Sequence, residues 1–445
     1  MTSALTRRCS HRSAIPGTTT CLRVGGYVEF QGYGINKYTQ ANQGTTNGGA
    51  LTRSVTDAVN THATARVFLD ARDSTEYGVL RTFARIQWDR SSGSDDNSGS
   101  QPRRGQMFAG TGSYANLQTG FYGSEAFIQL GGALFGRTTS SAWVGNPSTQ
   151  FTTQGPSNGR VNQVAYTASL GNGMSLTAAV EDAAELREGT FATTTGASAG
   201  GVAVLTPANS APDGVASFDV AQSWGTVKVA GVLHEVYVPK YTAGAQTDSG
   251  ASAKTGYAFM SGVKINLPMI AAGDFIYGYA TYGVGAMGRT LGNTATDTAN
   301  SAAAAAGAGG NASFGMGNAT WGGYDAIVNT TSGAVTLSKS YSFGGQFTHY
   351  FAPTVAAYVG GSFGAVNYGS AKMSASTSGL AAHNANMWGA ALGLIWSPVA
   401  GLEINPEVAY RKSNITSDTG IVNGNKTGVK SDDQYIGRLR VARSF

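Results

Sequence analysis

The sequence predicts an all-β fold, a sixteen-stranded antiparallel transmembrane β-barrel. Three observations support this prediction. Segments along the whole chain alternate apolar and polar side chains, which is typical of strands with two unlike faces. Glycine accounts for 63 of the 445 residues, whereas charged residues make up only 12%. The chain contains no run of 18 apolar residues, the length that a transmembrane helix requires, and a barrel has no need of one.

The last segment of the chain shows the alternation clearly. Tyr435 and Leu439 lie on one face, Arg438 and Arg440 lie on the other, and the chain ends at Phe445. Periodicity alone does not say which face points inward. In a membrane, an Arg or Lys at the lipid-facing midplane costs about 2–4 kcal/mol, so the basic face is expected to line the inside of the barrel.

Sixteen strands are expected, with Gly, Asn, Asp, Ser and Pro between them. They cover residues 22–34, 59–72, 76–89, 123–130, 132–138, 160–170, 173–182, 215–224, 226–237, 255–267, 272–284, 340–351, 354–366, 386–397, 400–413 and 432–445. The connections alternate between short and long, and the long ones are 35–58, 90–122, 139–159, 183–214, 238–254, 285–339, 367–385 and 414–431. Bacterial barrels have short periplasmic turns and long outer loops, so both chain ends are expected on the periplasmic side.

Two parts of the chain follow from this division. Residues 22–445 form the barrel, and residues 1–21 form a periplasmic N-terminal arm. The arm shows no apolar core of a signal peptide, which an exported protein requires, and we expect that the natural start lies elsewhere. Cys9 and Cys21 both belong to the arm. In an oxidising compartment they could close a short loop worth about 3 kcal/mol, and the alternative is two unpaired thiols.

Charged side chains on the inward faces predict a functional wall. Arginines recur on neighbouring strands, so we expect a basic ladder that governs which ions enter a water-filled barrel. The alternative is that some of them are ordinary residues at loop edges or between barrels. The expected wall residues are Arg66, Arg81, Arg85, Arg137, Arg438, Arg440 and Glu29.

The connection 139–159 holds no charged residue. Trp143 and Phe151 are its bulky anchors, and Asn146 lies between them. As the third loop of the barrel, a segment of this length would narrow the interior if it folded inward. Its neutrality means that the wall arginines alone would set the field there. The alternative is a plain surface loop.

Other kinds of chemistry find little support. No CxxC or HExxH motif is present, so no metal site is expected. The five histidines are isolated, no GxSxG motif exists, and the Gly-rich stretches lack a P-loop lysine, so neither an enzyme nor a cofactor is expected. Net charge is +5 and the basic residues are scattered, so nucleic acid is not expected as a partner.

Several segments resemble a known family. They are IPGTTTCLRVGGYVEF (15–30), SEAFIQLGGALFGRTTS (124–140), RVNQVAYTASLGNGMSLTAAVED (160–182), AQSWGTVKVAGVLHEV, GVKINLPMIAAGDFIYGYATY, FTHYFAP, LIWSPVAGLEINPEVAY and RLRVARSF. Together they resemble the porins of alphaproteobacteria, of the rhizobial type, over nearly all the expected strands. The resemblance implies a trimeric sixteen-stranded barrel in the outer membrane of a Gram-negative bacterium, with its third loop folded inside. It also implies passive diffusion of small hydrophilic solutes and ions.

Two departures from the family bear on this expectation. The segment between the two cysteines, which includes SHRSA, is shorter than the family's aromatic-rich one. The third loop also lacks the acids that many general porins place opposite their arginines, which favours a mild anion preference. A general porin is therefore the expected function. A substrate-specific channel would need more inward aromatics than Phe68, Phe83 and Tyr27, and a surface β-rich adhesin would need internal repeats, which are not found.

Overall fold

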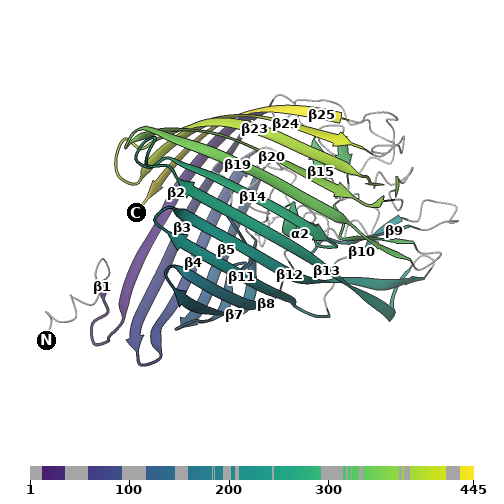
Figure 1. The fold of residues 1–445 in the computed structure, drawn as a ribbon, viewed down its shortest axis with the longest axis horizontal. Coiled ribbons are helices and arrows are strands. Elements are labelled where there is room, and N and C mark those ends of the chain that lie inside the picture. The colour runs from purple at the N-terminus through teal and green to yellow at the C-terminus, as the bar shows by residue number, and fades with distance from the viewer. Residues whose placement is uncertain are drawn as a thin grey trace.

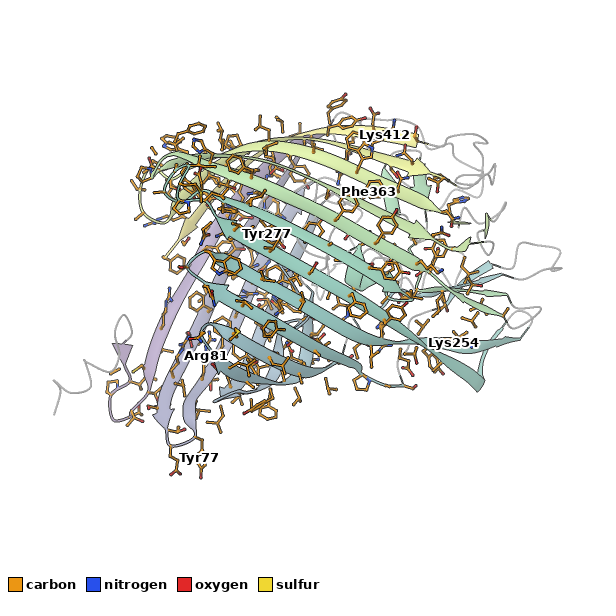
Figure 2. The ribbon with its side chains drawn as sticks, viewed as in Figure 1. Tyr77, Arg81, Lys254, Tyr277, Phe363 and Lys412 are labelled. Carbon is orange, nitrogen blue, oxygen red and sulfur yellow. The ribbon has the colours of Figure 1, made fainter. Side chains whose placement is uncertain are left out.

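Sixteen long strands close into one antiparallel barrel in the computed structural model of the chain (Figure 1). The barrel strands are β2 (Cys21–Ile35), β3 (Val59–Thr75), β4 (Gly78–Ser92), β5 (Leu117–Leu130), β6 (Ala133–Thr139), β7 (Arg160–Gly171), β8 (Met174–Asp182), β11 (Asp213–Gln222), β12 (Gly225–Thr242), β13 (Ala245–Asn266), β14 (Phe275–Val284), β19 (Lys339–Ala352), β20 (Val355–Asn367), β23 (Ala385–Trp396), β24 (Leu402–Ile415) and β25 (Ser431–Ser444). Each pairs with the next, and β25 returns to pair with β2. The predicted fold class and strand number are confirmed.

The structure describes most but not all of the chain. The described residues are 13–35, 59–92, 117–145, 159–182, 184, 186–193, 202–205, 210–242, 245–291, 314–316, 319–321, 323–329, 334–369, 373–374, 381–416 and 431–445. Within them, no helix is both long enough and apolar enough to cross a bilayer.

One predicted connection is largely strand. Residues 238–254 were expected to be a long loop, but β12 and β13 run through most of them as one extended hairpin. The register shifts between Val238 and Lys240, on either side of Pro239. Proline cannot donate a hydrogen bond to the ladder and is tolerated in sheets at bulges. The sequence signal therefore stops at the proline, although the pairing resumes beyond it.

The two faces of the barrel are chemically opposite. Along β3, Leu69 is 47% exposed while the next residue, Asp70, is 4% exposed. Along β25, Leu439 is 46% exposed and Arg438 is 5% exposed. Apolar side chains thus cover the outside and polar side chains lie within, which is the arrangement of a barrel in lipid. This settles the orientation that periodicity left open.

The short turns, the start of β2 and the end of β25 gather at one end of the barrel (Figure 1). Short turns join β3 to β4, β7 to β8 and β19 to β20 there, and the strand ends from which the long connections leave lie at the opposite end. The seam between first and last strands closes through Gly26 and Phe445, whose backbone N–H groups each donate to the other's carbonyl oxygen at 3.0 Å. We call the two ends of the barrel the turn end and the loop end.

The N-terminal segment folds back on the turn end. β1 (Ser13–Ala14) pairs with the first residues of β2, and the hydroxyl groups of Thr19 and Thr20 donate to Asp73 at 3.0 and 2.9 Å. Cys21 is buried and disulfide-bonded. Its predicted partner, Cys9, lies outside the described residues.

Short elements that the sequence did not predict occupy the long connections. A small sheet has the order β10 (Val202–Leu205), β9 (Thr190–Thr193), β17 (Ala326–Asn329), β18 (Val335–Leu337), and its β9–β17 pair is parallel. Two further ribbons are β15 (Phe314–Met316) with β16 (Ala319–Trp321), and β21 (Met373–Ser374) with β22 (Ala381–Ala382). The single-turn helix α2 (Met287–Thr290) follows β14. The β9–β17 pairing joins the connection after β8 to the one after β14.

Candidate functional site

The inner faces of β24, β25, β2, β3, β4 and β5 form a contiguous surface that we call the charged wall. Arg440 lies between two carboxylates, donating from Nε to Glu29 at 2.6 Å and from Nη1 to Glu403. One residue pair further toward the loop end, Arg438 is 3.4 Å from Glu407, with side chains only 2% and 0% exposed. The predicted group of Glu29, Arg438 and Arg440 does meet at the seam of the barrel.

Asp70 is shared by two arginines on the charged wall. Arg72 on its own strand and Arg81 on β4 each approach it at 2.9 Å. The Asp70 side chain is 6% exposed, while those of Arg72 and Arg81 are 35% and 27% exposed. The acid is covered and the guanidinium groups face the interior, so this part of the wall presents a net positive surface.

Glu125 is shared in the same way. It accepts from Arg85 on β4 at 2.7 Å and from Arg160, the first residue of β7, at 2.8 Å. The register shift between Arg85 and Ile86 leaves Ser124 as the extra residue of a bulge in β5, and the Ser124 hydroxyl oxygen accepts from Arg85 Nε at 2.7 Å. The bulge re-aims the local side chains, as bulges do at functional positions.

Arg66 has a different environment. Its Nε donates to the amide oxygen of Gln87 at 2.7 Å, and its guanidinium lies 4.7 Å from the ring centroid of Tyr27. A cation over an aromatic face is attracted by the ring quadrupole without charge neutralisation. Arg66 therefore keeps its positive charge toward the interior.

The charged wall differs from the predicted basic ladder in its acids. The residues that the sequence reasoning did not assign to the site are Asp70, Arg72, Glu125, Arg160, Glu403 and Glu407. Asp70 lies on the same alternating face as Arg66, and Glu403 and Glu407 share one face of their strand, so a signal was present. The acids were missed because the electric field in the channel was inferred from the uncharged third loop. The compensating acids come instead from neighbouring strands, whose register a single sequence does not give.

Arg137 does not join the group. Its register partners are Ala126 and Asn162, and it shares a face with Phe135, which is 50% exposed. That is the outer face of β6. The expectation that Arg137 lines the interior is therefore wrong for this structure, because β6 presents Leu134 and Gly136 inward instead.

The described start of the third loop, residues 140–145, lies against the inner face of the barrel. The carbonyl oxygen of Val144 accepts a hydrogen bond from the Tyr277 hydroxyl on β14 at 3.1 Å, and Ala142 and Val144 are buried among side chains of β7 to β14. The indole nitrogen of Trp143 is buried with no partner among the described residues. Asn146 and Phe151 lie outside them, so the path of the whole loop stays a prediction.

A second ionic cluster fastens other connections to the inner face near the loop end. Arg289 in α2 binds Glu181 on β8 at 2.8 Å and Asp213 on β11 at 2.7 Å. Asp213 also binds Arg187 at 2.9 Å and His234 at 2.8 Å. Burial acts to lower the pKa of Arg289, but the neighbouring carboxylates of Glu181 and Asp213 raise it above its ordinary value, so this guanidinium stays charged.

Asp325 ties this cluster to the small sheet. It accepts from the backbone N–H groups of Met287 and Glu188 at 2.7 and 2.8 Å and lies 3.4 Å from His234. No group of three or more His, Cys, Asp or Glu residues in the described part of the chain is placed to hold a metal ion. Through these contacts the cluster joins the connections after β8 and β14 to the inner faces of β8, β11 and β12.

Next to the charged wall, on the far side of β24, lies a neutral one, formed by the inner faces of β14, β19, β20 and β23. In the register of the sheet the described part of these faces presents mostly glycine, alanine, serine, threonine and tyrosine, together with Gln346 and Met387, and no charged side chain. Tyr358 reaches across β23 to donate to Glu407 at 2.6 Å, and Gly393 permits this because a Cβ there would lie 2.2 Å from the tyrosine ring. A neutral stretch of the interior thus lies between the charged wall and the strands that carry the ionic cluster around Arg289.

The chain is similar to known proteins in sequence and in fold. Residues 14–437 match the family described as the porin subfamily. Porin Omp2b of Brucella suis biovar 1 is 29% identical over 227 residues, which are 49% of this chain and 52% of that protein. Porin Omp2b of Brucella abortus strain 2308 gives the same values, so the chain spans about half the length of the curated relatives it matches.

Solved structures agree on the fold. The outer membrane channel DcaP of Acinetobacter baumannii aligns with a TM-score of 0.59 at 16% identity, over 96% of this chain and 97% of that one. OprB of Pseudomonas putida aligns with a TM-score of 0.50 at 10% identity, over 95% and 94%. At these identities the likeness concerns the barrel alone. Because the family match covers nearly the whole chain, the protein belongs to the porin subfamily.

Proposed function

We propose that this protein forms a water-filled channel in the outer membrane of a Gram-negative bacterium, through which small hydrophilic solutes and ions diffuse passively. The proposal rests on one observation: apolar side chains are exposed on the outside of the barrel, whereas ionised side chains lie inside it. Barrels of sixteen strands are wide enough to leave an aqueous channel. Membership of the porin subfamily supports the same function.

A weak anion preference is part of the proposal. Asp70 and Glu125 are each shared by two arginines, and Arg66 is held by neutral partners. These sites leave positive charge on the wall, whereas the group of Arg440 with Glu29 and Glu403 has one acid in excess and offsets some of that charge. The net field is therefore small and positive, and salt screens it over about 10 Å at 0.1 M.

A homotrimer is the proposed assembly, in line with the family. The outer faces near the chain ends combine exposed Val24, Val28, Phe30 and Leu439 with the small residues Gly32 and Gly437. Small residues allow close approach of two barrel walls, and the apolar ones would be buried between copies or covered by lipid.

The test is conductance of the purified protein in planar bilayers under a KCl gradient. Stepwise currents in groups of three, with a small reversal potential of the sign for anions, are expected. A folded protein that gives no conductance would contradict the channel and favour a surface β-rich role. Channels that open singly would contradict the trimer only, and a cation-selective reversal potential would contradict the anion preference only.

A further inference from the structure

A row of three phenylalanine rings crosses the charged wall near the turn end. Phe68 on β3 stacks with Phe83 on β4, with ring centroids 5.6 Å apart and planes inclined by 24°. Phe83 stacks in turn with Phe127 on β5 at 5.2 Å and 21°. We call these three rings the aromatic strip. All three lie on the inner face, because their register partners include Arg85 and Asp70.

The aromatic strip is not explained by barrel stability. Apolar side chains gain by facing lipid on the outside, and the outer face of the same strands already carries Val67, Leu69 and Ile86. Phe68 and Phe83 remain partly exposed toward the interior. Aromatic rings that stand in a solvent-lined interior mark a contact surface for an apolar part of a solute.

The geometry of the strip fits a planar ring. Near-parallel rings on neighbouring strands stand side by side on the wall, so that they turn their edges inward. The edge of an aromatic ring is electropositive and its face electronegative, so a planar aromatic solute lying on the wall would meet the edges with its face. Gly25 provides the space that the Phe68 ring occupies, because a Cβ at position 25 would lie 2.6 Å from Cζ of Phe68.

Guanidinium groups flank the aromatic strip. Arg81 lies 5.2 Å from the Phe83 centroid and 5.1 Å from that of Phe127, and Arg23 on β2 lies 5.5 Å from that of Phe68. Arg81 and Arg72 share Asp70. Arg23 is exposed and forms no ion pair with any residue that the structure describes. The surroundings of the strip therefore carry an excess of positive charge with one guanidinium open to an anion.

We propose that the aromatic strip and Arg23 form a subsite for small planar aromatic carboxylates at the turn end of the channel. The solute ring would lie on the strip, and its carboxylate would pair with Arg23, where two parallel N–H···O bonds suit a carboxylate. A sugar is the less favoured occupant, because the flanking groups are cations rather than the acceptors that hydroxyl groups need. The inference refines the proposed channel and depends on it.

The experiment measures block of single-channel KCl current by sodium benzoate added from either side. Cyclohexanecarboxylate, which keeps the charge without the planar ring, and benzyl alcohol, which keeps the ring without the charge, are the comparison probes. Benzoate is expected to bind more tightly than both. In the Phe83→Leu variant, the affinity for benzoate should fall about 2- to 10-fold, which corresponds to the energy of one aromatic pair. The affinity for cyclohexanecarboxylate should stay unchanged.

Two further variants separate charge from structure. Arg23→Gln should weaken benzoate several-fold and leave benzyl alcohol unchanged. Phe343→Leu is the matched control, because Phe343 stacks on Phe363 at 5.4 Å on the outer face and should not affect any probe. Equal affinity for benzoate and cyclohexanecarboxylate, insensitivity to Phe83→Leu, or stronger block by glucose would overturn the subsite. Absence of KCl current in the unmodified protein would instead refute the channel itself.

Discussion

Glu125 is the acid whose removal tests the charged wall most directly. It neutralises Arg85 at 2.7 Å and Arg160 at 2.8 Å, and all three side chains are less than 15% exposed. The substitution Glu125→Gln keeps the shape and one acceptor oxygen but adds one net positive charge to the wall. Anions should then permeate more readily and cations less readily.

The size of the effect follows from Coulomb's law. A unit charge and an ion about 8 Å apart in water interact with about 0.5 kcal/mol, and screening at 0.1 M roughly halves this. An anion gains and a cation loses that amount, so the chloride-to-potassium permeability ratio should rise about twofold. At 1 M salt the Debye length shrinks to about 3 Å, and the effect should vanish.

The assay is the reversal potential in KCl gradients centred near about 0.1 M and about 1 M salt. The double variant Glu125→Gln/Arg85→Gln restores the net charge of the wall and should return the ratio to its original value. Glu76→Gln removes an acid from an exposed turn and should change little. If folded Glu125→Gln keeps the original ratio at low salt, the pairs on this wall do not act on permeating ions.

Three further changes probe how the barrel is held together. Arg289→Met removes the guanidinium that joins two buried carboxylates, although Asp213 keeps Arg187 and His234. Loss of one partner of a buried ion pair costs about 3–5 kcal/mol, so faster proteolysis of the connections after β8 and β14 is expected while the barrel stays folded. Glu407→Gln removes the carboxylate that pairs with Arg438, and both side chains are nearly inaccessible to solvent. The variant should therefore lose its folded band on gels at a lower temperature. Gly26→Ala should block closure of the barrel, because its Cβ would lie 2.0 Å from a backbone oxygen of β3, whereas Gly437→Ala meets nothing within 4 Å and should be tolerated. An unchanged proteolysis pattern, an unchanged melting temperature, or equal folding of the two alanine variants would contradict the respective reasoning.

The strands were predictable because their signal is local. A period of two and the turn residues between segments are written in consecutive residues, so the sixteen strands and the inward direction of Arg438 could be read without any register. The extension of β12 and β13 could not, because Pro239 interrupts the local pattern while the hairpin continues through pairing across strands.

The partners of the arginines were beyond the reach of the sequence for a different reason. Arg85 meets Glu125 forty residues away, and Arg289 meets Glu181 across 108 residues. Such pairs depend on strand register and on the path of irregular connections, neither of which has a periodic signature. The prediction for Arg137 was wrong because a shift of one position in a strand moves a side chain from the inner face to the outer face.

The arrangement of acids explains how a wall can be both cohesive and selective. Arginines alone on adjacent strands would repel one another, whereas a carboxylate placed between two of them attracts both and links the strands that carry them. Asp70 and Glu125 each hold two arginines, so each leaves one uncompensated charge, while Arg440 between Glu29 and Glu403 leaves one of opposite sign. Selectivity in this barrel should therefore follow the ratio of arginines to acids at each such group rather than the number of arginines, which is why removing an acid is expected to shift it.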